Sequence, residues 1–419
     1  MSSESLSLQD ALDVAVKSFV TRNPRSKALH EEAVKTFPGG NTRTVLHTSP
    51  FPLCMKSGKD YQVTSEDGDT YTDLTAEFTA GLYGHSNPAI LAALQNVIQN
   101  VGLNVGATTA QEQLFARALC DRFDLERIRL TNSGKRKVVA FGGGYHGAVF
   151  GFKDGKVAAN NVDKADWIVA KYNDVESATR AIKSEGVAAV ILEAMQGSGG
   201  CICGTTEFLT GVQHAANEAS TKTLIMTSRI SSAGLSAVHG LKPDLKTFGK
   251  YLGGGVAFGA FGGREDIMAV YDPRVKGSVA HSGTFNNNTF VTHCGYAGLT
   301  KVYPREVAEA FTKTGDDLLA RLNEASKGTK LCFTGTGSVA TSHFVAHGPR
   351  TISDALDVAE IDELKDLFWF HLLENGFWVT RRGFYALVLG TPQSELDRFV
   401  SVVHGFLAKY AALVQADTT

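Results

Sequence analysis

Hydrophobic and polar positions follow three different patterns along the chain. In the first part, residues 7–20 and 26–36 show the spacing of amphipathic helices, which predicts an N-terminal helical arm. The run Tyr61–Asp73 instead alternates residue by residue around Asp67-Gly68, which predicts a hairpin.

The middle of the chain combines short apolar runs with helical stretches. Asn87-Pro88 is a typical helix start for a helix over Ala89–Val101, and a second helix follows at Ala110–Phe123. Strands are then expected at Ile128–Leu130, Val138–Phe141, Trp167–Val169, Ala188–Leu192 and Thr223–Ile225, with helices at 174–184 and 207–219. Such alternation predicts an α/β domain with a mainly parallel sheet flanked by helices.

The last part has a third pattern, typical of a smaller α+β domain. We expect a long helix at 304–325, strands near 331–333, 338–345, 377–380 and 386–389, a helix at 361–374 and a final helix. Ser394 opens that last helix and Asp397 completes a capping-box pattern. The expected division is therefore an arm and small-domain part at 1–75, a large α/β domain at 76–302 and a small domain at 303–419.

Composition narrows the possible function. The 419 residues include 41 basic and 43 acidic side chains, so no basic surface suggests nucleic-acid binding. The mean hydropathy of -0.06 and the lack of a long charge-free apolar run exclude a membrane span. The first apolar stretch carries Asp13 and Lys17, which predicts an amphipathic helix rather than a secretory signal.

Six cysteines are scattered along the chain, without a C-x-x-C pair. Cys201-Ile202-Cys203 lacks a second pair of ligands at zinc spacing. We therefore expect reduced thiols in a cytoplasmic protein, with no metal site.

The stretch Phe248–Gly255 carries the strongest chemical signal, because Lys250 follows a glycine and precedes three more. A lysine amine condenses reversibly with an aldehyde, and a desolvated lysine loses its proton more readily. Glycines let the backbone approach a flat ligand. Taken alone, the stretch also fits a surface lysine before a flexible loop.

Three further loops could hold an anionic, planar ligand. Thr131–Gly134 ends a strand with small polar groups whose backbone amides could hold an anion. Gly142–Gly147 presents Tyr145, whose ring could stack on a flat cofactor. His281–Asn288 offers a hydroxyl and amides suited to a phosphate. Each of these loops alone is more typical of ordinary loop architecture than of a functional site.

Two arginines are candidates for binding carboxylates. Arg43 follows the glycine turn that begins at Pro38, and Arg382 lies in Arg381–Phe384. The planar guanidinium matches a carboxylate, although each residue taken alone is more typical of a solvated loop charge. Gly142-x-Gly144-x-x-Gly147 also matches a dinucleotide fingerprint, so a nicotinamide-dependent oxidoreductase stays an alternative.

Together these motifs resemble those of class III, fold-type I aminotransferases that use pyridoxal 5′-phosphate, in the branch near glutamate-1-semialdehyde aminomutase. The resemblance is strongest to the β-amino-acid (β-phenylalanine) aminotransferases and runs from about Thr36 to the end. It rests on PGGNTR at 38–43, FTAGLYGHS at 78–86, GGYHG at 143–147, GKYLGGG at 249–255, FGAFGGR at 258–264, HSGTFNNN at 281–288 and RRGF at 381–384.

The resemblance implies transamination between an amino acid, including β-amino acids, and a 2-oxo acid. Lys250 would form the Schiff base with the cofactor and shuttle the proton. Tyr145 and His146 would belong to the ring pocket, with Tyr145 stacking on the ring.

The resemblance also assigns the remaining site residues and a homodimer. Ser133 and Gly134 would hold the phosphate, helped by Thr284 from the other subunit. Arg43 and Arg382 would bind substrate carboxylates.

The sequence departs from the family pattern after Gly134. Family members continue into Thr-Glu-Ala and a full helix before the next strand, whereas here Lys135-Arg136-Lys137 leads directly into Val138–Phe141. Parallel strands need a crossover of about a dozen residues or more. Either the two strands pair as a hairpin, one leaves the sheet, or the chain lacks residues that its relatives possess.

A second departure removes the expected partner of the cofactor's ring nitrogen. In the family, the strand before Met-Thr-Ser-Arg ends in Phe-Asp-Glu-Val, and its aspartate keeps the pyridine nitrogen protonated. Here Ile225 runs directly into Met226, and no acid occurs between Glu218 and Asp244.

Both gaps are clean excisions between matching flanks, a pattern typical of a truncated gene model, a splice form or an engineered deletion. We expect weak or absent activity from this chain. A non-catalytic relative that keeps the scaffold for interaction is the second alternative.

Overall fold

The computed structural model describes residues 7–103, 105–129, 138–146, 152, 155–157, 164–226, 228–279, 283, 285–346 and 352–417. Its α-helices are α1 Leu8–Arg22, α2 Pro24–Ala33, α3 Pro88–Asn96, α4 Ala110–Phe123, α5 Val175–Ile182, α6 Thr206–Glu218, α7 Leu235–Val238, α8 Glu265–Met268, α9 Thr289–Ala297, α10 Arg305–Ala325, α11 Asp362–Glu374, α12 Gln393–Lys409 and α13 Ala411–Val414. Its strands are β1 Met55–Lys59, β2 Gln62–Ser65, β3 Thr70–Asp73, β4 Arg127–Arg129, β5 Val138–Phe141, β6 Trp167–Ala170, β7 Ala189–Glu193, β8 Met195–Gln196, β9 Ile202–Cys203, β10 Lys222–Met226, β11 Leu245–Gly249, β12 Gly259–Gly263, β13 Leu331–Thr336, β14 Val339–Phe344, β15 Phe377–Trp378 and β16 Phe384–Ala386.

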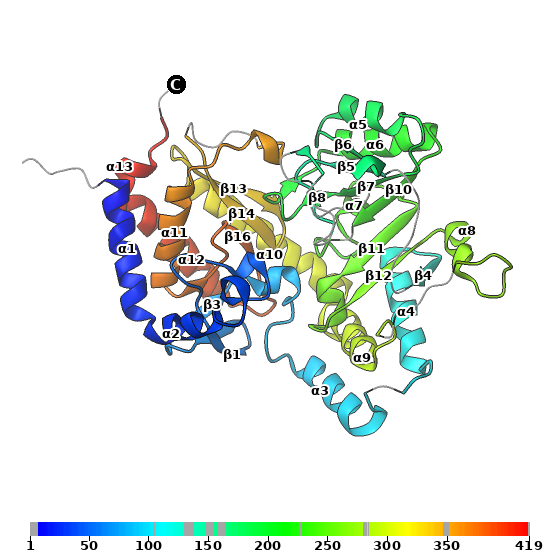
Figure 1. The fold of residues 1–419 in the computed structure, drawn as a ribbon, viewed down its shortest axis with the longest axis horizontal. Coiled ribbons are helices and arrows are strands. Elements are labelled where there is room, and N and C mark those ends of the chain that lie inside the picture. The colour runs from blue at the N-terminus through cyan, green and yellow to red at the C-terminus, as the bar shows by residue number, and fades with distance from the viewer. Residues whose placement is uncertain are drawn as a thin grey trace, which may run out of the picture.

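A seven-stranded sheet forms the centre of the larger lobe, in the order β4-β12-β11-β10-β7-β5-β6. Strands β11, β10, β7, β5 and β6 run parallel, and β12 is antiparallel to β11. Helices α5 and α6 lie side by side next to this sheet (Figure 1). Strands covered on both faces favour the apolar runs that the sequence shows, so the predicted mainly parallel α/β domain is confirmed.

The two strands that flank the first sequence gap do not pair with each other. β4 lies at one edge of the large sheet against β12, whereas β5 lies between β7 and β6 near the other edge. A hairpin and the loss of a strand from the sheet are therefore both wrong. The third explanation, a chain that lacks residues, stays a prediction, because the connection 130–137 lies outside the described residues.

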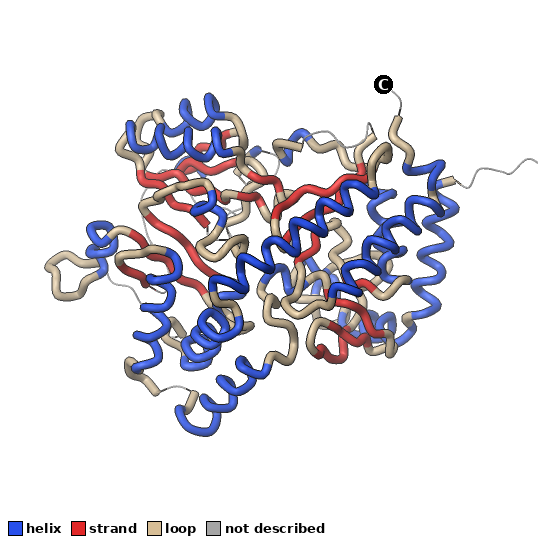
Figure 2. The backbone as a smooth tube through the Cα atoms, turned by 180° about the vertical axis from the view of Figure 1, so that it is seen from behind, coloured by secondary structure: helices blue, strands red, loops and turns tan. Residues whose placement is uncertain are grey.

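The smaller lobe is built from the N-terminal and C-terminal parts of the chain. The predicted hairpin is confirmed as β2 and β3, and β15 near the C-terminus adds to it in the sheet β1-β2-β3-β15. Helix α1 packs along α11 (Figure 1), and α10 crosses the middle of the molecule (Figure 2). The division of the chain at residues 76 and 303 stays a proposal.

Two local predictions in and near this lobe are wrong. Helix α12 begins at Gln393 after Pro392 and has no side-chain cap, because Asp397 accepts a hydrogen bond from Gln393 and pairs with Arg321 instead. The strand expected at 386–389 lies at Phe384–Ala386, where it pairs with β14. The start at Asn87 is confirmed, since its side chain accepts hydrogen bonds from the first backbone amides of α3.

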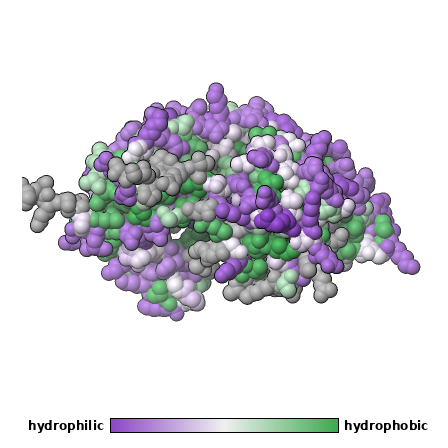
Figure 3. Space-filling model, turned by 90° about the horizontal axis from the view of Figure 1, so that it is seen from above, coloured by the Kyte–Doolittle hydropathy of each residue, from purple (hydrophilic) through white to green (hydrophobic). Residues whose placement is uncertain are grey.

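The face in Figure 3 is mostly hydrophilic, with hydrophobic patches between the polar atoms. No helix among the described residues is long and apolar enough to cross a membrane.

Two helical glycines differ in how closely other parts of the chain approach them. A Cβ on Gly315 of α10 would lie 2.0 Å from the carbonyl oxygen of Gly337, in the turn between β13 and β14. A Cβ on Gly405 of α12 would meet no atom within 4 Å. The same substitution therefore tests close packing at one position and helix propensity at the other.

We expect Gly315→Ala to destabilise the fold by about 1–3 kcal/mol, because backbone must move to admit the methyl group. Gly405→Ala, the matched control, should stabilise it by roughly 0.5–1 kcal/mol, since alanine loses less entropy in a helix. Urea unfolding of both variants provides the measurement. If both substitutions changed the free energy of unfolding in the same direction, the close packing at Gly315 would be contradicted.

Candidate active site around Lys250

Lys250 lies where β11 ends and a short helical turn, η7 Lys250–Gly253, begins. Its backbone is left-handed, with φ 56°, which turns the chain sharply at the edge of the sheet. Ligands bind at the carboxyl ends of strands in open α/β sheets. The Lys250 Nζ donates a hydrogen bond to the Phe78 carbonyl oxygen at 3.1 Å, and the side chain keeps solvent access.

The partner of Lys250 lies on a strained turn, η3 Ala76–Thr79, in which all four residues have positive φ. Buried Asp73 holds the start of this turn, since its Oδ1 accepts hydrogen bonds from the Thr75 and Ala76 amides. Left-handed backbone costs on the order of 1–2 kcal/mol per residue. Strain of this kind typically persists at functional sites, where the surrounding structure enforces it.

The two candidate arginines meet at the Phe78 ring but differ in their partners. The Arg43 guanidinium lies 5.3 Å from the ring centroid and forms an ion pair with Glu77. The Arg382 guanidinium lies 5.5 Å from the same centroid and 5.4 Å from that of Phe384. Its Nη1 donates to Ser198 Oγ at 3.1 Å, and no carboxylate in the described part of the chain pairs with it. Arg382 is therefore the guanidinium that is free for a ligand.

Glu193 is a site residue that the sequence reading missed. It ends β7, where its Oε1 accepts from the Tyr145 amide at 2.7 Å and its Oε2 from the Gly197 amide at 3.0 Å. Burial raises the pKa of Glu193 to about 7, although both amides and the Lys250 charge oppose the increase. An acid directly after a buried apolar run was the available signal.

The pKa of Lys250 reports which charges surround its amine. Burial lowers this pKa, Glu193 raises it, Arg382 and Arg43 lower it, and Glu77 raises it. A lowered pKa increases the neutral, nucleophilic fraction of a lysine. The contacts of all three residues with Phe78 show that the fold brings Lys250, Arg43 and Arg382 together.

His146 and Met226 mark the second sequence gap. Met226 ends β10 in register with Glu193, and its sulfur lies 3.0 Å from His146 Nδ1. The His146 Nε2 is buried and has no hydrogen-bond partner among the described residues, and burial lowers the pKa of His146 to about 4. A thioether, which is only a weak acceptor, therefore contacts a buried imidazole at the end of the strand that lacks the expected aspartate.

Arg229 lies on the other side of the same gap and is 3% exposed. Its Nη2 donates to the carbonyl oxygens of Ser338 and Leu387, but Nε and Nη1 have no partner within the described residues. A buried guanidinium is costly unless it is paired. Of these two groups, only the His146 ring contacts the Ile225–Met226 junction, where the sequence predicts a missing acid.

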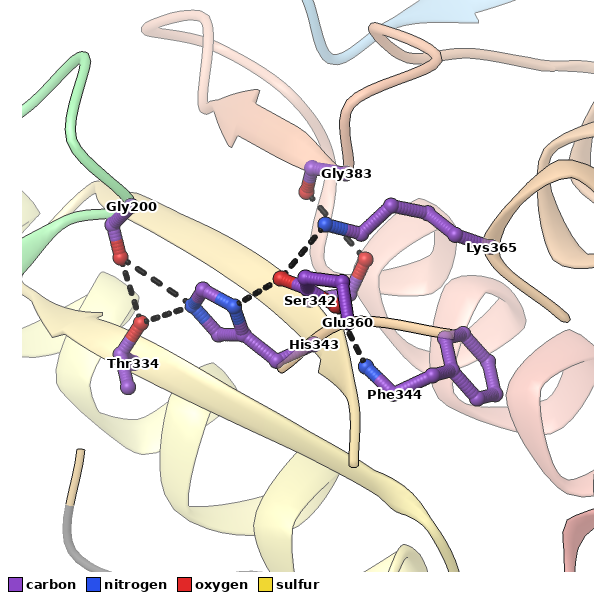
Figure 4. Close-up of polar contacts among 8 residues, drawn as sticks. All are labelled: Gly200, Thr334, Ser342, His343, Phe344, Glu360, Lys365 and Gly383. Carbon is purple, nitrogen blue, oxygen red and sulfur yellow. Dashed lines mark hydrogen bonds and ion pairs between the residues drawn. The ribbon is translucent and has the colours of Figure 1, made fainter. Parts of the chain in front are cut away.

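A cleft of ≈ 510 Å³ lies beside the Tyr145 and Arg382 side chains. One wall is a buried polar network, in which His343 Nε2 contacts the Thr334 hydroxyl and the accepting carbonyl oxygen of Gly200, and His343 Nδ1 contacts Glu360 (Figure 4). Lys365 Nζ pairs with the same Glu360 carboxylate at 2.7 Å. The network ties the Gly200 turn of the larger lobe to β13, β14 and α11.

The remaining predicted residues divide into two groups. Tyr145 is 39% exposed beside the cleft, where its ring is accessible for stacking, and His146 follows it. Ser133, Gly134 and Thr284, predicted for the phosphate, lie outside the described residues. The Tyr145 ring beside the cleft is thus accessible for stacking on a planar ligand, whereas Lys250 is not among the residues that line this cleft, and β10 supplies no carboxylate.

Comparison with known proteins agrees with this geometry. The profile of the family described as aminotransferase class-III matches residues 45–136 and 134–334. An uncharacterised aminotransferase of Schizosaccharomyces pombe is 41% identical over 436 aligned positions, which cover 99% of both chains. A β-phenylalanine transaminase of Variovorax paradoxus is 39% identical, over 97% of this chain and 98% of the relative.

Solved structures give the same result. The β-phenylalanine aminotransferase structure from Variovorax paradoxus aligns with a TM-score of 0.94 at 38% identity, covering 98% of this chain and all of that one. A glutamate-1-semialdehyde aminomutase variant from Pseudomonas aeruginosa PAO1 in complex with PMP has a TM-score of 0.85 at 20% identity, covering 97% and 100% of the two chains, and supports the fold alone.

The chain therefore belongs to the class-III aminotransferase family, with the fold-type I architecture. It is a pyridoxal-phosphate-dependent aminotransferase by family, so the predicted fold class, enzyme class and cofactor are confirmed.

The comparisons also bear on the gaps. The family profile matches in two pieces that meet at residues 134–136, where the first gap is predicted. The alignment of 436 positions exceeds the 419 residues of this chain by 17, so at least 17 positions of the relative have no counterpart here.

The electrostatic link between Glu193 and Lys250 gives a testable pH effect. In Glu193→Gln the carboxylate that raises the pKa of Lys250 is lost, so the pKa of Lys250 should fall. We expect the midpoint of Lys250 methylation by formaldehyde and borohydride, followed by peptide mass mapping on cofactor-free protein, to move to lower pH. The difference should be greatest above pH 7, where Glu193 is ionised in the unchanged chain. Lys183, paired with Glu218 at the surface, is the internal control, and an equal shift at both lysines would contradict the link.

Proposed function

We propose that this chain is built to transfer an amino group between a β-amino acid and a 2-oxo acid, with Lys250 as the central residue. The observation that carries the proposal is the setting of the Lys250 amine. It lies at the carboxyl edge of a parallel sheet, has a lowered pKa and stands within the influence of two arginines and two glutamates. A structural lysine would not require these neighbours.

Each residue has a role in this proposal. Lys250 attaches the cofactor and moves a proton within the site. Tyr145 stacks on the cofactor ring, and Arg382 binds a substrate carboxylate. Pyridoxal 5′-phosphate, when bound, supplies the electron sink that amino transfer needs. Ser133, Gly134 and Thr284 are proposed for its phosphate.

Support for a β-amino acid donor comes from the relatives. The Variovorax paradoxus protein is named a β-phenylalanine transaminase, and its structure aligns over almost the whole chain. Phe78 and Phe384 provide apolar walls beside Arg382, which suits a ligand that joins a carboxylate to an apolar body.

We further propose that the chain in its present form is weak or inactive. The His146 ring, whose Nε2 has no hydrogen-bond partner among the described residues, contacts Met226 at the Ile225–Met226 junction. Without an acid at this junction, the ring nitrogen of the cofactor loses the charge that makes it an effective electron sink.

Restoring the two gaps tests this proposal. The change inserts Phe-Asp-Glu-Val between Ile225 and Met226 and transplants the segment after Gly134 from the Variovorax paradoxus relative. We expect amino transfer from β-phenylalanine to 2-oxoglutarate to rise at least about 100-fold, because a general electrostatic partner of this kind contributes several kcal/mol. Product formation measured by chromatography provides the rate.

Lys250→Ala in the restored chain is the control, and it should abolish transfer. In the unchanged chain, borohydride reduction in the presence of cofactor should attach the cofactor's mass to Lys250. A restored chain that binds cofactor at Lys250 but transfers no amino group would favour the non-catalytic scaffold. A Lys250→Ala chain that keeps its activity would overturn the role of Lys250.

The homodimer is also a proposal. Exposed apolar side chains occur on Leu103, Val105 and Phe285, which are 52%, 46% and 71% exposed. They lie close together, since Thr289 Oγ1 donates to the Leu103 carbonyl and Asn287 to that of Ala107. Exposed apolar side chains that lie near one another in this way are typical of an interface. The six free cysteines suit a reducing compartment, and we propose the cytoplasm, which cell fractionation tests.

The double change Leu103→Asp and Phe285→Asp should convert the dimer to a monomer, because charges would be buried at the interface. Sedimentation equilibrium measures the mass. The matched control is Val14→Asp, an exposed residue (67%) of α1 that should leave the mass unchanged. A monomeric unchanged chain would overturn the proposal.

A further inference from the structure

Arg43 and Arg382 contact the same ring and yet differ in charge balance. Arg43 is neutralised by Glu77, whereas Arg382 has only the Ser198 hydroxyl as a hydrogen-bond partner among the described residues. As long as Glu77 holds Arg43, the site offers one free guanidinium to a ligand.

The backbone fixes the position of Glu77. Glu77 is the second of the four left-handed residues of η3. It follows Ala76, which is fully buried, and precedes Phe78, whose carbonyl oxygen accepts the hydrogen bond from Lys250. The amide of Gly81 donates to the Ala76 carbonyl at 2.8 Å and closes the turn. The backbone of this turn therefore holds the base of the Glu77 side chain beside Arg43, in a segment that also positions the Lys250 contact.

The ion pair itself is open to exchange. The side chains of Arg43 and Glu77 are 44% and 57% exposed. Exposed ion pairs are weak, so a second carboxylate can compete with Glu77 for Arg43, but it meets the like charge of Glu77. A ligand with a single carboxylate at Arg382 meets no such competition.

We propose that Glu77 is a specificity-determining residue, which acts through Arg43 to favour ligands with one carboxylate and an apolar body over dicarboxylates. The inference rests on the proposed function, because it assumes that Arg382 and Arg43 face the substrate. Glu77 is a positioning residue, since it contacts Arg43 rather than the reacting atoms.

Calorimetric titration of the purified full-length chain with two unreactive carboxylates tests this inference. 3-Phenylpropanoate carries one carboxylate and a ring, and glutarate carries two carboxylates. Glu77→Gln should strengthen glutarate binding about tenfold, because it removes one like-charge contact and frees Arg43, and should change 3-phenylpropanoate binding less than about twofold. Asp397→Asn, which breaks the comparably exposed pair with Arg321 on α12, is the matched control and should change neither.

A second set of titrations, in chains that also carry Arg43→Met, tests whether Glu77 acts through Arg43. In Arg43→Met the gain in glutarate binding from Glu77→Gln should disappear. An equal gain for both ligands, no gain for glutarate, or a gain that persists in Arg43→Met would overturn the inference. These titrations need no amino transfer, so a chain that shows the expected binding but no activity would contradict only the proposed reaction.

Discussion

The hydrogen bond from Lys250 Nζ to the Phe78 carbonyl joins two pieces of left-handed backbone, and the geometry of the site depends on it. One piece is the turn at the end of β11, and the other is the four-residue turn η3. Neither conformation is favourable for non-glycine residues, so each must be held by its surroundings. Asp73 does this for η3 through two backbone amides, and its other oxygen contacts His85 at 3.0 Å.

The charged groups around this contact differ in burial and in their partners. Glu193 is enclosed and held by two amides, so its charge near Lys250 varies around neutral pH. Glu77 is exposed and neutralises Arg43. Arg382 has two aromatic neighbours and a serine, and keeps its charge for a ligand. The site therefore has two different sides. The side near Lys250 changes its charge around neutral pH, and the side near Arg382 is available to bind a carboxylate.

The gap after Ile225 has a visible physical consequence. Burial of polar groups is tolerated when each finds a partner. At this junction a histidine nitrogen faces a thioether, and a buried arginine leaves two nitrogens without partners in the described residues. The flanking sheet is nevertheless regular, with β10 in register between β7 and β11. The sheet thus keeps its register at this junction, while His146 and Arg229 keep buried polar atoms without partners among the described residues.

The sequence by itself determined most of the elements and singled out Lys250 as the candidate for cofactor attachment, because these depend on local patterns. The apolar runs at Val138–Phe141 and Ala189–Glu193 specify buried strands, and the glycines around Lys250 specify a turn that exposes an amine. Only the tertiary structure decided which side chains meet. Residues 77, 193 and 382 are far apart in the chain, and the crossings of the sheet bring their charges to one lysine. The capping pattern at Ser394 failed for the same reason, since the contact of Asp397 with Arg321 on α10 outweighs a local preference.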